Sequence, residues 1–353
     1  MANNVAKIAL FTTSLAAGGA EKSLIRLARL LNANNIDVVL VIAESGGAIL
    51  EPEDIDLHYL SNRGRRRFSF LRKLWLSFQL RLYLERNNFH LIISTLPAAD
   101  DIVAMSRFPN TISRIANLYG LDVESQHSPR KRARRLRRYK NLYQSRRLVC
   151  TTEYMANHMR ENFGSSNVTV IHNFLDDVCE SQDTDLLVPD EYCIHIGRYM
   201  PQKRHNFLLR VWSKFPNLPK LMLLTKPNQK LQSEIETLNL IDRVTVVDYV
   251  QNPLPLIRRS QCLILCSAYE GFPSVLIEAM HVNTRIASGP CGGVVPELCR
   301  DVPKVICDDS SVDSFGSDVE RVLALPVSDY ASTMQRYSKE RALTIWTQLI
   351  HRA

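Results

Sequence analysis

The 353-residue sequence has no long uncharged apolar run and no CxxC pair of cysteines. A membrane-spanning helix needs about 20 apolar residues, so none is expected. The eight cysteines are scattered, several within apolar runs, and none has a histidine at zinc-finger spacing. This favours buried, reduced thiols over disulfides or a metal site. The start of the chain also lacks the basic region of a signal peptide. We therefore expect a soluble, cytoplasmic protein.

Acidic residues are outnumbered, 36 against 44 lysines and arginines, which gives a formal charge of +8. The basic excess is concentrated in residues 63–86 and 130–147, whereas the second half of the chain is nearly balanced. A basic first half indicates an acidic partner, such as an anionic membrane surface, a phosphorylated acceptor or nucleic acid.

Short runs rich in Val, Ile and Leu alternate with amphipathic stretches along the chain. Continuous apolar runs are typical of strands buried on both faces, as in a parallel sheet covered by helices. We predict strands at residues 8–11, 38–42, 91–94, 111–115, 148–151, 168–171, 192–196, 220–224, 243–247, 262–266 and 285–288. The predicted fold class is α/β, with two doubly wound units in tandem.

An acidic, polar stretch separates the two series of strands. It covers residues 176–190 and ends in Val188-Pro189-Asp190, which is typical of a linker. We predict four segments: an N-terminal, acceptor-binding Rossmann-like domain at residues 1–178, a linker at 179–190, a nucleotide-sugar-binding Rossmann-like domain at 191–330, and C-terminal helices at 331–353 that pack back toward the first domain.

Gly18 and Gly19 follow the first predicted strand and precede a helical pattern. Glycine lets a ligand approach the backbone closely, and the amides at a helix N-terminus can hold an anion. The spacing is not GxGxxG, so this is not the dinucleotide fingerprint. A plain tight turn explains the two glycines equally well.

A second motif follows the first strand of the second series. It contains Gly197, Arg198 and Lys203. Strand ends beside a topological switch are where open α/β sheets bind ligands, and the two cations would suit a diphosphate. A solvated basic loop is an equally good interpretation of this segment.

A third motif follows the predicted strand at residues 262–266. Gly271 allows a sharp turn, and Pro273 suits the first position of a helix, so the amides of residues 272–275 would face a ligand. Glu270 lies in the loop and Glu278 in the second helical turn, so the two carboxylates can reach different parts of an elongated ligand. Both could instead be surface glutamates, but Glu278 stands among apolar neighbours and needs a partner.

These motifs, in this order, resemble those of the large family of retaining GT-B glycosyltransferases numbered four. Glu270 to Glu278 is similar to its E-x7-E signature, and the segment from Gly197 to Lys203 is similar to its donor-phosphate motif. The likeness also includes Gly18-Gly19-Ala20-Glu21 and Val170-Ile171-His172-Asn173-Phe174.

The resemblance implies a GT-B fold, in which two Rossmann-like domains face a central cleft. It also implies that Arg198 and Lys203 bind the donor diphosphate, that Glu278 binds the ribose, and that Glu270 holds the transferred sugar. The catalytic candidates are Arg198, Lys203 and Glu270. The other implied donor-binding residues are Gly18, Gly19, Gly197, Gly271, Phe272, Pro273, Ser274 and Glu278. Two protein cations can replace a metal ion, so we expect neither a metal nor a cofactor.

Two basic segments are candidates for membrane or acceptor binding. Their residues are Arg65, Arg66, Arg67 and Trp75 in the first segment, and Arg134, Arg135, Arg137 and Arg138 in the second. The first segment leads into a helical pattern with Trp and Phe on its apolar side, as in helices that lie on anionic membranes. An ordinary helix that buries an apolar stripe is the alternative. The second segment has no acid to balance it, and the alternative is a solvated charged helix.

The expected function is transfer of a hexose-type sugar from a UDP- or GDP-sugar to a hydroxyl of a growing glycan. The expected acceptor is lipopolysaccharide core, capsule or another lipid-linked bacterial cell-envelope glycan, reached from the cytoplasmic face of the inner membrane. A nucleotide-sugar epimerase and an inverting GT-B transferase remain alternatives. A basic nucleic-acid-binding protein leaves Glu270 and Glu278 unexplained and lacks an aromatic stacking platform, so we expect no nucleic-acid partner.

Overall fold

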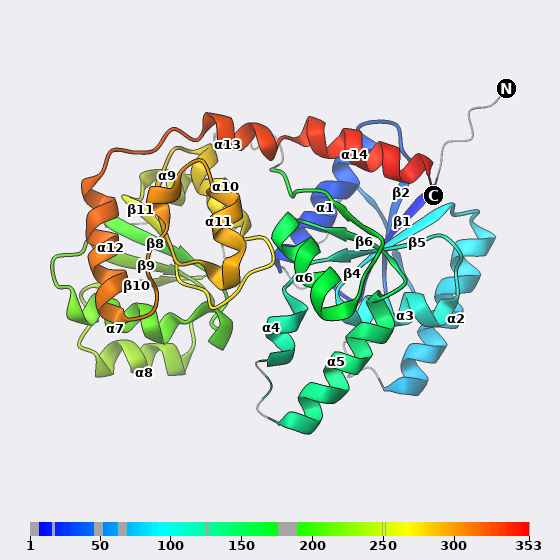
Figure 1. Cartoon of the computed structure of the whole chain (residues 1–353), viewed down its shortest axis with the longest axis horizontal. Helices are drawn as coiled ribbons and strands as arrows, with labels where there is room; N and C mark the ends of the chain where they lie inside the picture. Colours follow the sequence, from blue (N-terminus) through cyan, green and yellow to red (C-terminus); the bar gives the residue numbers. More distant parts are fainter. Residues whose placement is uncertain are drawn as a thin grey trace. The chain divides into compact units, whose positions relative to one another are not determined.

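A computed structural model describes residues 7–15, 18–45, 52–62, 69–124, 126, 128–175, 189–248, 250 and 252–352. It divides into two compact units: unit 1 is residues 1–176 with 338–353, and unit 2 is residues 177–337. Each unit contains a parallel sheet with helices packed on it (Figure 1). The predicted α/β class with two Rossmann-like sheets is thus confirmed. Residues 179–188 of the predicted linker lie outside the described residues.

Unit 1 has a seven-stranded parallel sheet in the order β3-β2-β1-β4-β5-β6-β7. Its strands are β1 (Ile8–Thr12), β2 (Val38–Ile42), β3 (Asp56–Tyr59), β4 (Leu91–Thr95), β5 (Thr111–Ile115), β6 (Arg147–Cys150) and β7 (Val168–Val170). Its helices are α1 (Gly19–Asn32), α2 (Phe70–Arg86), α3 (Pro97–Ser106), α4 (Tyr119–Glu124), α5 (Pro129–Tyr143), α6 (Glu153–Phe163) and α14 (Lys339–His351).

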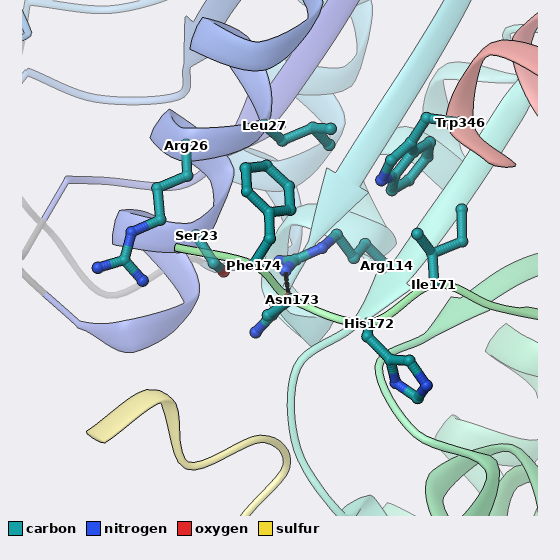
Figure 2. Close-up of a pocket in the computed structure, with 9 residues that line it drawn as sticks. All are labelled: Ser23, Arg26, Leu27, Arg114, Ile171, His172, Asn173, Phe174 and Trp346. Carbon is teal, nitrogen blue, oxygen red and sulfur yellow. Dashed lines mark hydrogen bonds between the residues drawn. The ribbon is translucent and has the colours of Figure 1, made fainter. Parts of the chain in front are cut away.

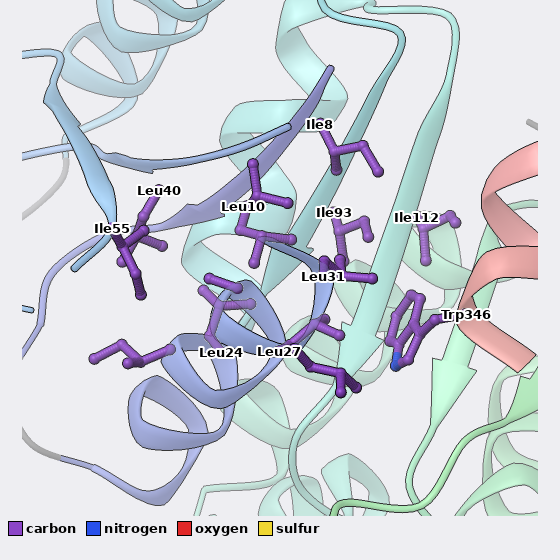
Figure 3. Close-up of a cluster of buried hydrophobic side chains, with 14 of the residues drawn as sticks. Ile8, Leu10, Leu24, Leu27, Leu31, Leu40, Ile55, Ile93, Ile112 and Trp346 are labelled. Atoms are coloured by element: carbon purple, nitrogen blue, oxygen red, sulfur yellow. The ribbon is translucent and has the colours of Figure 1, made fainter. Parts of the chain in front are cut away.

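Two cores cover the two faces of the unit 1 sheet. Because successive strand residues point to opposite faces, Ile8 and Leu10 of β1 belong to one core while Ala9 and Phe11 belong to the other. The first core includes leucines of α1 and Trp346 of α14 (Figure 3), and the second lies against α2 and α3. Each strand in the centre of the sheet is therefore apolar on both sides, which is why its sequence shows a continuous apolar run.

Unit 2 has a five-stranded parallel sheet in the order β10-β9-β8-β11-β12. Its strands are β8 (Tyr192–Ile196), β9 (Lys220–Leu224), β10 (Val244–Val247), β11 (Cys262–Leu265) and β12 (Arg285–Ser288). Its helices are α7 (His205–Lys214), α8 (Gln229–Thr237), α9 (Leu254–Arg259), α10 (Ser274–His281), α11 (Val294–Leu298), α12 (Val312–Ala324) and α13 (Ala331–Arg336). Short 3₁₀ turns are η1 (Pro201–Lys203), η2 (Cys291–Gly293) and η3 (Pro303–Val305).

Every strand predicted from the sequence is present, with its ends within one residue of the predicted ones. The prediction missed one strand, the edge strand β3. Its four residues are exposed or half-buried, because it pairs with β2 on one side only. Its sequence, Asp-Leu-His-Tyr, is not a continuous apolar run, so the pattern used for the other strands could not detect it.

Both sheets are doubly wound about a switch point. In unit 2 the chain starts at β8, continues through β9 to β10 on one side, and then crosses to β11 and β12 on the other. The switch point therefore lies between β8 and β11, and in unit 1 the corresponding point lies between β1 and β4. Ligands of such sheets bind beyond the carboxyl ends of the strands at this point.

Seven of the eight cysteines lie in the described part of the chain, and all seven are buried free thiols. Burial raises the pKa of the Cys193 and Cys266 thiols to about 12, so both are protonated at neutral pH. The expectation of buried, reduced cysteines holds for these seven residues, whereas Cys179 lies outside the described residues.

Candidate functional site

The candidate site of unit 2 is built from two loops that leave β8 and β11 at the switch point. The first loop, residues 197–204, contains Gly197, Arg198 and Lys203, and the second, residues 266–273, contains Glu270. β8 and β11 are hydrogen-bonded neighbours, so both loops start from the same edge of the sheet. The structure thus brings together two motifs that lie 67 residues apart in sequence.

Several hydrogen bonds join these two loops. The amide of Ala268 donates to the carbonyl of Gln202 (2.8 Å), and Nε2 of Gln202 donates to the carbonyl of Tyr269 (2.7 Å). The Cys266 thiol donates to the carbonyl of Lys203 (3.6 Å). Most of these contacts involve the backbone, so they fix the paths of both loops and hold the charged side chains at a set separation.

Lys203 and Glu270 form an ion pair at the centre of the candidate site. Nζ of Lys203 lies 2.6 Å from Oε1 of Glu270, and the two side chains are 21% and 10% exposed. Gly197 makes room for the lysine, since a Cβ at this position would lie 3.1 Å from Cδ of Lys203. An ammonium group has three N–H donors, so Lys203 can bind further oxygen atoms while it contacts Glu270.

The two arginines of the first loop, Arg198 and Arg204, differ in their exposure and in their contacts. Arg198 is exposed and, within the described part of the chain, has no hydrogen-bond or ion-pair partner. Arg204 is held in place, because Nη1 donates to Oδ2 of Asp309 at 2.6 Å and its guanidinium stacks 4.1 Å from the ring centre of Phe207. Arg198 is therefore a cation of this loop that can bind an external anion without competing with a carboxylate of the described residues.

The helix after the second loop is α10, and it begins at Ser274, one residue later than predicted. Pro273 occupies the position just before the helix rather than its first position. Gly271 is buried, and the half-buried ring of Phe272 packs against Tyr337 with ring centres 5.8 Å apart. The first amides of a helix have no intrahelical acceptor, so those of α10 can bind an acceptor from outside the helix.

Glu278 lies in the second turn of α10, as the sequence predicted, and is 9% exposed. Its neighbours along the helix are buried, and so is Glu270 at 7% exposure. A buried carboxylate is costly unless it is paired, so both residues are unlike ordinary surface glutamates. The alternative interpretation, that both are surface glutamates, is therefore wrong.

One loop of this site was not among the candidates predicted from the sequence. The loop after β12 contains Cys291, Gly292 and Gly293, which have positive φ values of 49°, 73° and 100°. The carbonyl of Cys291 accepts a hydrogen bond from the amide of Glu270 (3.1 Å), which places this loop beside the ion pair. Its two adjacent glycines lie a few residues after a strand, which is a signal of the same kind as Gly18 and Gly19.

Two buried histidines lie near Lys203. His195 is in β8 and His205 starts α7, with ring centres 4.9 Å apart. Burial lowers the pKa of His195 to about 3, with a smaller contribution from His205. Burial and the nearby charge of Lys203 lower the pKa of His205 to about 4. Both rings are therefore neutral at pH 7 and leave the positive charge of the site to the lysine and arginine side chains.

The remaining donor-binding candidates, Gly18 and Gly19, belong to unit 1. Gly18 is the residue just before α1, and Gly19 is the first residue of the helix. A Cβ on Gly18 would lie 2.3 Å from a carboxylate oxygen of Glu21, whereas one on Gly19 would meet nothing within 4 Å. The backbone at Gly19 is thus open to a ligand.

The membrane or acceptor candidates of unit 1 lie on α2 and α5. On α2 several large apolar side chains are exposed: Phe70 (72%), Leu71 (75%), Leu74 (48%), Trp75 (42%) and Phe78 (59%). The guanidinium of Arg72 lies 4.4 Å from the centre of the Trp75 ring. The opposite face of α2 buries Leu76, Leu80 and Leu84, so this helix has a core stripe and an exposed apolar row. Arg65, Arg66 and Arg67 lie outside the described residues.

On α5, Arg134, Arg137 and Arg138 are exposed and Arg135 is half-buried. The interpretation that no acid balances this segment is wrong for Arg138. Its guanidinium donates to Oδ2 of Asp101 in α3 at 2.6 Å, and Lys73 of α2 also pairs with Asp101. Asp101 of α3 therefore links α2 to α5. The three residues lie far apart in the sequence, so no local pattern predicted this contact.

Two features of the described residues concern metals and membranes. No group of three or more His, Cys, Asp or Glu side chains that could hold a metal ion occurs among them. No helix that they form is long and apolar enough to cross a bilayer.

Comparison with known proteins gives two family matches that together cover most of the chain. Residues 17–178 match the model described as Glycosyltransferase Family 4, and residues 180–341 match Glycosyl transferases group 1. The boundary between the two matches falls close to the boundary between units 1 and 2.

Individual relatives are similar over part or all of the chain. An uncharacterized glycosyltransferase of Methanocaldococcus jannaschii is 36% identical over 104 residues, covering 28% of this chain and 25% of the relative. The N-acetylgalactosamine-N,N'-diacetylbacillosaminyl-diphospho-undecaprenol 4-alpha-N-acetylgalactosaminyltransferase of Campylobacter jejuni is 24% identical over 132 residues, covering 36% of each. The chain thus spans about a quarter to a third of the length of these curated relatives.

The fold is similar to that of a solved structure, Anabaena HepE with UDP and glucose. The TM-score is 0.78 at 17% sequence identity, and the match covers 99% of this chain and 100% of that one.

Proposed function

Because the chain belongs to glycosyltransferase family 4 and has its GT-B fold, we propose that it transfers a hexose-type sugar from a nucleoside-diphosphate donor to a hydroxyl of a glycan or glycolipid. The observation that carries this proposal is the Lys203–Glu270 ion pair, which the loops after β8 and β11 hold at the switch point of unit 2. We assign the donor to unit 2 and the acceptor to unit 1.

The charges of the site suit the departure of a diphosphate. When the bond between the anomeric carbon and the donor phosphate oxygen breaks, negative charge develops on the diphosphate. Arg198 and Lys203 stabilise that charge, and because their loop is fixed by hydrogen bonds, little reorganisation is needed during the reaction. No protein-bound metal ion or cofactor is required by this scheme.

The two carboxylates have separate roles in this proposal. Glu278 accepts hydrogen bonds from the ribose hydroxyls, and Glu270 accepts one from the transferred sugar while it keeps Lys203 in position. The amides at the start of α10 and those of the glycine loop after β12 face the diphosphate. Carboxylates are strong acceptors for hydroxyl donors, and the burial of both glutamates gives these bonds a water-poor environment.

The proposed stereochemistry is retention at the anomeric carbon, supported by the spacing of Glu270 and Glu278. A nucleotide-sugar epimerase or an inverting transferase is the alternative within the same fold. The anomeric proton coupling of the isolated product, measured by NMR, separates these cases: an inverted product, or a free epimerised sugar without transfer, would overturn the proposal.

Nucleotide binding tests the donor site directly. We would titrate UDP, GDP and ADP into the full chain by calorimetry in EDTA, and repeat the titration with Glu278→Ala. UDP is favoured as the donor nucleotide, since the structurally similar HepE was solved with UDP. We expect one nucleotide to bind without metal and Glu278→Ala to weaken it about 10- to 100-fold, the effect of losing hydrogen bonds to a charged acceptor.

Glu236→Ala is the matched control, because Glu236 is an exposed glutamate of α8 in the same unit. It should bind the nucleotide as the natural protein does. If the folded natural protein binds none of the three nucleotides, or if the two variants are weakened equally, the assignment of the donor site is wrong.

We also propose that unit 1 lies on the cytoplasmic face of an anionic membrane when it meets its acceptor, as a peripheral protein. The exposed apolar row of α2, residues 70, 71, 74, 75 and 78, would enter the headgroup region, and the arginines of α5 would contact anionic lipids. Asp101 of α3 pairs with Lys73 of α2 and with Arg138 of α5, so both helices are tied to α3. The Campylobacter relative, whose name includes diphospho-undecaprenol, supports a lipid-linked acceptor.

Vesicle sedimentation tests this surface. The full chain should bind phosphatidylglycerol vesicles more strongly than phosphatidylcholine vesicles, and Phe78→Ser with Leu74→Ser should reduce binding at least severalfold. A matched control is Ile241→Ser, because Ile241 is an exposed apolar residue (63%) of unit 2. Equal binding by the α2 variant and the natural protein would contradict the proposed membrane surface.

A further inference from the structure

Arg114 is a buried cation that the donor-site proposal does not use. It lies near the carboxyl end of β5 and is 4% exposed. Its guanidinium donates from Nη2 to Oδ1 of Asn173, while Nη1 has no hydrogen-bond partner in the described part of the chain. No carboxylate among the described residues forms an ion pair with it.

Burying an unpaired charge is unfavourable, so an arginine without a counter-ion is unusual. Burial lowers the pKa of Arg114 to about 10, which still leaves the side chain protonated at neutral pH. The fold therefore holds a positive charge and a free N–H donor in a place where an apolar side chain would cost less. An anion that binds there would supply both the counter-charge and the missing acceptor.

The unpartnered side chain lines a cavity of unit 1. The cavity is small: its free volume is ≈ 10 Å³, about enough for one water molecule, and it opens to solvent. Figure 2 shows its lining: Ser23, Arg26, Leu27, Arg114, Ile171, His172, Asn173, Phe174 and Trp346. Ser23 and Arg26 are one turn apart on α1, so they lie on the same side of that helix. In the view of Figure 2, Ser23 lies between Arg26 and the guanidinium of Arg114.

These polar groups are suited to one class of ligand. Two guanidinium groups repel a metal ion and are not needed for a neutral sugar, whereas they match the oxygen atoms of a phosphate or carboxylate. The Ser23 hydroxyl donates to the carbonyl of Ala20 at 3.0 Å, and rotation would let it donate to such an oxygen instead. The cavity also lies at the carboxyl ends of β5 and β7, the edge at which parallel sheets bind ligands.

We propose that Arg114, with Arg26 and Ser23, forms a subsite of unit 1 that binds an oxyanion group of the acceptor, a phosphate or a carboxylate. This inference rests on the proposed glycosyl transfer and narrows its acceptors to those that carry such a group near the accepting hydroxyl. The bond between Arg114 and Asn173 orients the guanidinium, so Asn173 is a positioning residue.

Titration of the full chain with inorganic phosphate and, separately, with acetate tests the subsite. Calorimetry would compare the natural protein with Arg114→Gln, which can keep a hydrogen bond to Asn173 but loses the charge. Phosphate that binds at the cations of unit 2 is unaffected by this change, so the difference between the two proteins reports on unit 1. We expect Arg114→Gln to weaken binding of at least one of the two anions tenfold or more. Arg26→Gln should have a smaller effect.

The matched control is Arg81→Gln, because Arg81 is an arginine of α2 that is already paired with Glu85. It should bind both anions as the natural protein does. If neither anion binds, or if Arg114→Gln binds both unchanged, the subsite does not exist. If Arg114→Gln and Arg81→Gln weaken binding equally, the anions interact with net charge alone and the proposal is overturned.

UDP binding in the same samples separates this proposal from the donor site. Arg114→Gln that binds UDP normally is folded, so its loss of anion binding supports the subsite. Arg114→Lys gives a second test, since it retains the charge and should retain part of the binding. Arg114-dependent anion binding in a protein that fails to bind any nucleotide would support the subsite and refute the donor proposal.

Discussion

Units 1 and 2 have the same parallel, doubly wound design but treat a cation near the strand ends in opposite ways. In unit 2, Lys203 lies 2.6 Å from Glu270, and both charges are compensated without a ligand. In unit 1, Arg114 is more deeply buried and has an amide, not a carboxylate, as its hydrogen-bond partner in the described part of the chain. One cation is neutralised by the fold, and the other is not.

This difference has a consequence for ligand binding. An anion that binds near Lys203 must share the lysine with Glu270, so part of the attraction is already used in the free protein. An anion that binds at Arg114 meets a charge that the fold leaves uncompensated, and its binding should stabilise the folded state. We infer that unit 2 stabilises a negative charge that develops on the ligand during the reaction. Unit 1 binds a negative charge that the ligand carries before, during and after the reaction.

Removing the paired cation should have the largest effect. Lys203→Met leaves Glu270 buried and unpaired, and it removes a donor to the departing diphosphate. We expect turnover of the nucleotide sugar to fall about 10²- to 10³-fold and the free energy of unfolding to fall by about 1–3 kcal/mol, since the pair is partly exposed. Release of nucleoside diphosphate and urea denaturation measure the two quantities.

Lys214→Met is the control for this prediction. Lys214 of α7 pairs with Asp313, but both side chains are more than half exposed. The change should alter the free energy of unfolding by no more than about 0.5 kcal/mol. Turnover by Lys203→Met within twofold of the natural protein would show that this lysine does not stabilise the leaving group.

The two units should also respond oppositely to acid. The pKa values of His195 and His205, about 3 and 4, lie below the ~6.5 of an unfolded histidine. The unfolded state therefore binds more protons, so the stabilisation of the folded state by the neutral histidines is present above pH 6.5 and is lost as the pH falls toward 4.

Burial raises the pKa of Asp100 in unit 1 to about 6, above the ~3.9 of an unfolded aspartate. The contribution of Asp100 to the stability of the folded state is present below pH 3.9 and is lost as the pH rises through 6.

Between pH 7 and pH 5 we expect unit 2 to lose roughly 2 kcal/mol for each histidine and unit 1 to gain roughly 1 kcal/mol. Hydrogen exchange of the full chain, followed by mass spectrometry and corrected for intrinsic rates, reports on each unit separately. His205→Asn should reduce the loss in unit 2, and Asp100→Asn should remove the gain in unit 1. Parallel changes in both units would contradict these two assignments.

The sequence was sufficient for the architecture because a buried parallel strand has a local signature. Each such strand is a continuous apolar run, and its end marks a candidate ligand-binding edge. That reasoning selected Lys203 and Glu270 separately, but their contact depends on β8 and β11 being neighbours, which no local pattern specifies. The edge strand β3 was missed because its sequence, Asp-Leu-His-Tyr, contains no continuous apolar run.

Arg114 illustrates what local patterns cannot predict. Its sequence neighbours, Ser113, Ile115 and Ala116, identify a strand end but do not indicate that the arginine is buried or that it lacks an acidic partner. Its hydrogen-bond partner, Asn173, lies 59 residues away on another segment. The absence of a counter-ion is a property of the packed unit, so it can be recognised only after the chain has been folded.

The smallest expected effect gives the most direct test of the comparison between the two cations. Arg114→Met removes an uncompensated charge and replaces it with an apolar side chain of similar length. Because the cost of burying the charge offsets the lost bond to Asn173, the free energy of unfolding in urea should stay the same or rise by up to about 1 kcal/mol. Arg114→Lys retains the charge and should not gain stability. A loss as large as that of Lys203→Met would mean that Arg114 is held for the structure of unit 1, and both cations would then be stabilising in the free protein.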